Sequence, residues 1–75
     1  MNIYPNPVKD YFTVNKSSDD KVTVKVYDSN GKLVIEKFVE QNTEQIDVSR
    51  LANGAYFIEI LNAGIRMHKA TIIKQ

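Results

Sequence analysis

Side chains suited to catalysis or metal binding are few in this 75-residue chain. It has one histidine, His68, and no cysteine, which excludes thiolate nucleophiles and thiolate metal ligands. Metal sites usually take three or four ligands, and oxygen ligands could come from predicted turns that hold Asp19, Asp20, Asp28 and Asp47. Because these turns are separate, we expect no catalytic residue, cofactor or metal, and interpret His68 as a strand residue. A rival hypothesis, a small enzyme built on His68, requires a concave pocket holding His68 and a carboxylate.

Two short motifs have both a chemical and a structural interpretation. Asp19 and Asp20 could offer oxygen ligands to calcium, but they lack the alternating spacing of an EF-hand loop, so a solvated turn is favoured. Asn15-Lys16-Ser17 matches the N-glycosylation pattern, which arises often by chance.

The seven aromatic side chains suggest a second class of function. They could form an exposed platform for sugars, which would make the chain a generic adhesive or carbohydrate-binding module. More often such side chains belong to a core. Tyr56 is then expected to be the most buried of them, because it opens the longest alternating strand.

Length and composition limit the architecture. A chain of 75 residues forms one domain at most, so we predict a single domain over residues 1–75. Ten basic and nine acidic side chains give a net charge of +1, which argues against a nucleic-acid-binding face. No apolar run approaches the roughly 20 residues that span a bilayer.

Apolar and polar residues alternate with a period of two, which predicts β-strands. Val22, Val24 and Val26 share one face, and the same alternation marks residues 11–15, 45–48 and 56–61. Residues 33–39 have apolar side chains on both faces, and in the last strand we expect Ala70 and Ile72 to point inward. Turn signals separate the runs every 8–12 residues or so, which is typical of an all-β antiparallel sandwich of about seven short strands.

Three stretches, in a fixed order, resemble a known family. The first is Tyr4-Pro5-Asn6-Pro7 followed by a strand at 10–14, and the second is residues 26–34 with a turn at Asp28 and Gly31. The third is residues 46–58, which include Leu51, Gly54 and Tyr56, and the chain closes with residues 69–74. Their order and spacing closely resemble the C-terminal sorting domain of the type IX (Por) secretion system of Bacteroidota. Gln75 departs from that pattern, since many members end on a basic or apolar residue.

The resemblance implies an immunoglobulin-like sandwich that acts as a folded export signal and not as a catalyst. It implies an N-terminal cargo upstream of Met1, an outer-membrane translocon that recognises the domain, and a sortase-like peptidase that removes it. The implied destination is the cell surface or the medium, reached through the periplasm and outer membrane, with no nucleic-acid partner and no direct membrane span.

The resemblance also assigns residues to two roles. Residues expected to mediate sorting are Lys69, Ala70, Thr71, Ile72, Ile73 and Lys74. Residues expected to shape the fold are Tyr4, Pro5, Asn6, Pro7, Asp28, Gly31, Leu51, Gly54 and Tyr56. We expect the last strand, residues 66–74, to lie at a sheet edge, where unpaired backbone groups could add a strand from a partner. Lys69 and Lys74 could supply charge to that contact, or could simply protect the edge against aggregation.

Overall fold

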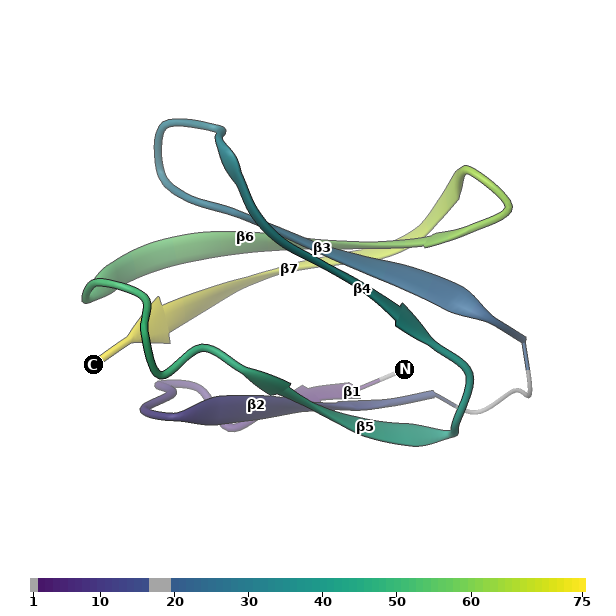
Figure 1. Ribbon diagram of the computed structural model, residues 1–75, viewed down its shortest axis with the longest axis horizontal. Coiled ribbons are helices and arrows are strands. Elements are labelled where there is room, and N and C mark those ends of the chain that lie inside the picture. Colours follow the sequence, from purple (N-terminus) through teal and green to yellow (C-terminus); the bar gives the residue numbers. More distant parts are fainter. Residues whose placement is uncertain (1, 17–19) are drawn as a thin grey trace.

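The computed structural model describes residues 2–16 and 20–75, and its regular elements there are all strands. The strands are β1 (Asn2–Tyr4), β2 (Tyr11–Asn15), β3 (Val22–Tyr27), β4 (Leu33–Val39), β5 (Thr43–Asp47), β6 (Gly54–Asn62) and β7 (Ile65–Lys74). They form a three-stranded sheet in the order β1-β2-β5 and a four-stranded sheet in the order β4-β3-β6-β7. The two sheets lie face to face (Figure 1), so the predicted all-β, immunoglobulin-like sandwich of seven strands is confirmed. No helix in the described ranges could cross a membrane.

The core lies between the two sheets, as the alternation of apolar and polar residues predicted. Its buried members are Val8, Phe12, Val14, Val22, Val24, Val26, Val39, Ile46, Val48, Tyr56, Ile58, Ile60 and Ile72. β4 has mixed burial, as its sequence indicated: Val39 is buried, whereas Phe38 is 74% exposed. β4 is an edge strand with a register shift beside Val26 and Tyr27, which explains why its faces do not alternate cleanly.

The prediction that Tyr56 is the most buried aromatic residue is wrong. Phe12 is fully buried, whereas Tyr56 is 6% exposed. The phenol of Tyr56 needs a hydrogen-bond acceptor, and it finds one at the rim of the sandwich, the main-chain oxygen of Ala52 at 2.7 Å. Phe12 has no polar atom and can lie entirely between the sheets.

The turn from β3 to β4 has the predicted form. The N–H of Gly31 donates to the Asp28 main-chain oxygen at 3.0 Å, and Gly31 has a φ of 84°. The Asp28 carboxylate accepts the N–H groups of Asn30 and Lys32, each at 2.9 Å. Asp28 is therefore a turn residue whose side chain replaces missing backbone hydrogen bonds.

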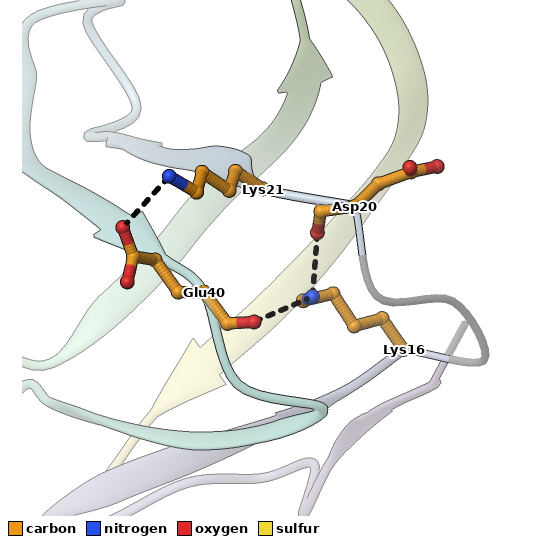
Figure 2. A network of polar contacts seen from close by, with 4 residues as sticks. All are labelled: Lys16, Asp20, Lys21 and Glu40. Atoms are coloured by element: carbon orange, nitrogen blue, oxygen red, sulfur yellow. Dashed lines mark hydrogen bonds and ion pairs between the residues drawn. The ribbon is translucent and has the colours of Figure 1, made fainter.

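A buried lysine holds together the end of the sandwich near residue 20. Lys16 is 2% exposed, and its Nζ donates to the main-chain oxygens of Asp20 at 2.5 Å and Glu40 at 3.2 Å. Figure 2 shows these two bonds together with the ion pair between Lys21 and Glu40 at 3.4 Å. Lys16 therefore ties the end of β2 to segments of the opposite sheet. The predicted glycosylation motif and calcium turn include Ser17 and Asp19, which lie outside the described residues.

The hairpin between β6 and β7 contains a conformation unfavourable for its residue type. Ala63 has a φ of 53° and Gly64 a φ of 80°, the arrangement of a type I′ turn. Left-handed backbone is costly for alanine because of its Cβ, whereas asparagine tolerates it better.

We therefore expect Ala63→Asn to stabilise the domain by about 0.5–1 kcal/mol, which corresponds to a rise in Tm of roughly 2–8 °C. Thermal unfolding followed by circular dichroism measures this shift. Gly64→Ala is the matched control and should lower the Tm, because its φ of 80° favours glycine. A lower Tm for Ala63→Asn would contradict the turn assignment.

Candidate recognition edge

β7 lies at one edge of the four-stranded sheet and pairs there with β6 (Figure 1). Its side chains alternate near the C-terminal end: Ile72 and Lys74 are buried, whereas Ile73 is 42% exposed. Ala70 shares the inward parity of Ile72 and is half-buried, as predicted. The expected edge position of the last strand is thus observed.

The N-terminal segment covers the C-terminal half of this edge. Val8 forms a parallel bridge with Lys74, in which the Val8 N–H donates to the Ile73 oxygen and the Gln75 N–H donates to the Val8 oxygen, both at 2.8 Å. The Asn6 carboxamide continues the pattern, because its Nδ2 donates to the Thr71 oxygen at 3.2 Å and its Oδ1 accepts the Ile73 N–H at 3.0 Å. Asn6 therefore acts as a side-chain substitute for one peptide group of an added strand.

This contact gives the Tyr-Pro-Asn-Pro motif a structural explanation. Tyr4 ends β1 in the three-stranded sheet, opposite Thr13, whereas Val8 pairs with the four-stranded sheet. Pro5 and Pro7 lie where the chain passes from one sheet to the other. The N–H groups that proline lacks are not needed there for hydrogen bonds between strands. The N-terminal segment therefore joins both sheets.

We expect Asn6→Ala to expose the edge without unfolding the domain. The substitution removes both Asn6 bonds to β7 but no buried apolar group, so the expected loss of stability is about 1 kcal/mol. Amide exchange measured by NMR should accelerate at Ile73 and stay unchanged at Ile58, in the centre of β6. Unchanged exchange at Ile73 would show that Asn6 does not protect this edge.

Closer to the middle of β7 the edge is open. Because Thr71 and Ile73 turn their backbone groups away from β6, antiparallel alternation directs those of Lys69 outward as well. By this alternation the N–H and C=O of Lys69 and the N–H of Thr71 point away from β6, and no turn or loop of the described residues bonds to them. These groups can accept an added strand.

The Leu51, Gly54 and Tyr56 motif supports the same edge from the neighbouring strand. Gly54 lies opposite Lys74, and Tyr56 lies opposite Ile72. Half-buried Leu51 packs against the core, and the Tyr56 bond to Ala52 closes the turn in the manner of a tyrosine corner. Gly54 begins β6 with a φ of 147° and is a strand residue, not part of the turn itself.

Asp47 stabilises the turn that precedes this motif. The Ser49 N–H donates to its Oδ1 at 2.8 Å, and hydrogen bonds from the Ser49 side chain and backbone hold the pKa of Asp47 below its ordinary value. Because the folded pKa is lowered, this small contribution is present above the unfolded pKa and is lost as the pH falls through the folded one.

The structure brings some predicted residues together and separates others. Asn6 and its neighbours meet the last strand, whereas Asp28 and Gly31 lie in the turn that leads to β4, the opposite edge. His68 is half-buried opposite Ile60, and no described cluster of His, Asp and Glu side chains could hold a metal ion. Sequence reasoning missed Val8, although a lone apolar residue between Pro7 and charged positions was a usable signal.

The exposed aromatic residues do not gather into one platform. Tyr4 and Tyr11 belong to the three-stranded sheet, whereas Phe38 and Phe57 belong to the other, on strands separated by β3. Tyr27 donates to Glu59 Oε1 at 3.2 Å; burial first, and then this bond, raise the pKa of Tyr27. The geometry thus gives little support to a sugar-binding face of coplanar rings.

The fold and its edge define a small immunoglobulin-like sandwich that ends in an exposed edge strand. The family model described as "Secretion system C-terminal sorting domain" matches residues 2–74, so the chain belongs to this family. It is 29% identical over 76 residues to an endo-acting ulvan lyase of Formosa agariphila, across 99% of this chain. The match spans 15% of that enzyme's length.

Membership defines the coarse function of the chain. It is a sorting signal of type IX secretion, which directs export to the cell surface or the medium. Such a domain is a signal and not a catalyst.

Proposed function

We propose that residues 1–75 form a single sorting domain of a larger exported protein, and that β7 is the element recognised by the outer-membrane translocon. The main support for this proposal is that the last strand is long, lies at a sheet edge and directs the backbone groups of Lys69 away from β6. The share of the ulvan lyase that the match spans supports an N-terminal cargo. A sortase-like peptidase then removes the domain, which itself performs no reaction.

Burial divides the six predicted sorting residues into two groups. Lys69, Thr71 and Ile73 are exposed and can meet a partner directly. The alternate residues, Ala70, Ile72 and Lys74, face inward, and Ile72 belongs to the core. We assign recognition to the first group and support of the edge to the second.

An export assay with a secreted reporter fused before residue 1 tests this proposal. Deleting residues 70–75 should abolish release of the reporter, but it also removes Ile72 from the core. Thr71→Pro is the sharper variant, because it removes an outward N–H without breaking a bond to β6.

We expect Thr71→Pro to remain folded, by circular dichroism, and to reduce export at least tenfold. Ser29→Pro, in the distant turn that leads to β4, is the matched control and should export normally. Normal export by both the deletion and Thr71→Pro would overturn the assignment of β7 as the recognised strand.

A further inference from the structure

Charges of alternating sign cross the outer face of the four-stranded sheet in one row. Glu36 on β4 lies opposite Lys25 on β3, Lys25 opposite Glu59 on β6, and Glu59 opposite Lys69 on β7. Glu36 and Lys25 form an ion pair at 3.8 Å, and Glu59 also pairs with Arg66 at 3.9 Å. Opposite charges on neighbouring strands stabilise a sheet, and like charges destabilise it. The row stops at Lys69, where the sheet ends.

A groove of about 460 Å³ lies beside the end of this row. Its lining residues are Tyr27, Phe57, Ile58, Glu59, Arg66, Lys69, Ala70 and Thr71. Phe57 is 46% exposed, and its direct neighbour toward the edge on this face is Thr71, whose side chain is small. An apolar side chain placed beyond Thr71 could therefore cover this ring.

The charge of β7 favours an acidic occupant. Residues 65–74 contain Arg66, Lys69 and Lys74 and no carboxylate. Arg66 already faces Glu59, whereas no ion pair of Lys69 occurs within the described residues. An anionic side chain opposite Lys69 would complete the row.

We propose that the open edge of β7 accepts one extended strand of a partner protein, which places an acidic side chain opposite Lys69 and an apolar side chain two positions away, over Phe57. The strand bonds to the outward backbone groups of Lys69 and Thr71, and it stops where Asn6 and Val8 already occupy the edge. This inference rests on the proposed recognition of β7 and specifies the chemistry of the partner.

A peptide strand fits these observations better than a glycan. The Glu59 carboxylate, which a sugar would need as an acceptor, is already engaged by Tyr27 and Arg66. The outward N–H and C=O groups of Lys69, in contrast, match the hydrogen-bonding pattern of another strand.

The test is an NMR titration of the ¹⁵N-labelled 75-residue chain with blocked heptapeptides, Thr-Phe-Thr-Xaa-Thr-Phe-Thr, in which Xaa is Glu, Gln or Lys. Because phenylalanine lies two positions from Xaa on both sides, one of them can cover Phe57 whether the peptide binds parallel or antiparallel to β7. We expect the amide signals of Lys69 and Thr71 to shift, and affinity to fall from Glu to Gln to Lys by about fivefold overall. Lys69→Glu should reverse this order. Lys21→Glu, an equal charge change at a highly exposed side chain, should preserve it.

Three results would overturn the inference: no response of the Lys69 and Thr71 amides, equal affinity for all three peptides, or an order unchanged by Lys69→Glu. Laminaripentaose is titrated in parallel, and a shift at Tyr27 and Phe57 with this sugar but not with peptide would assign the groove to a glycan instead. Export of the reporter with Lys69→Glu separates the two proposals. Normal export there, with export lost in the 70–75 deletion and Thr71→Pro, would reject the charge rule and leave recognition of β7 standing.

Discussion

Phe12→Ala is expected to remove most of the stability of the domain. Phe12 lies in β2 with no exposed surface, between the two sheets. Truncation of a buried phenylalanine to alanine costs about 3–5 kcal/mol, because apolar contact is lost and a cavity remains. A domain of this length has about 4–11 kcal/mol in total at ordinary values per residue, so the variant should be largely unfolded at moderate temperature.

Urea unfolding measured by circular dichroism checks this expectation. Phe38→Ala is the matched control, since the same atoms are removed from a side chain that is 74% exposed, and it should change stability by no more than about 0.5 kcal/mol. Phe12→Leu keeps the site apolar and should lose about 1–1.5 kcal/mol. Equal losses for Phe12→Ala and Phe38→Ala would mean that the core does not lie between the sheets as described.

The sequence predicted the sandwich because its signals are local. Alternation at Val22, Val24 and Val26 needs only the two-residue period of a strand, and the Asp28 to Gly31 turn needs only its own side chain and a glycine. These features were confirmed as predicted. The sequence of β4 has no clean two-residue period, and there a register shift and an edge position allow Phe38 to face the solvent.

The recognition edge could be predicted only in outline. That the last strand lies at an edge follows from its terminal position, but its partial coverage by Asn6 and Val8 joins residues 65 or more positions apart. Lys16 is a similar case. A single lysine in a polar stretch does not indicate that its ammonium group will donate to two main-chain oxygens and be buried. Long-range polar contacts of this kind leave no periodic pattern in the sequence.

Gly54 is the second position at which a large effect is expected. It begins β6 opposite Lys74 with a φ of 147°, a backbone region that residues with a Cβ rarely adopt. No heavy atom lies within 4 Å of a Cβ built there, so crowding is not the obstacle. Gly54→Val should cost about 1–3 kcal/mol through backbone strain, and loosen the pairing of β6 with the C-terminal end of β7.

Chemical synthesis of the 75-residue chain allows either enantiomer of alanine at position 54, which distinguishes backbone strain from other causes of lost stability. Alanine of the L form at position 54 should lower the Tm, whereas D-alanine, which favours positive φ, should keep it at or above the value for glycine. The two variants have the same composition and the same added methyl group, so hydrophobicity and size cancel. Equal melting temperatures would show that Gly54 does not need its positive φ. A difference of several degrees would show that the positive φ of Gly54 stabilises the start of β6, the strand with which β7 pairs.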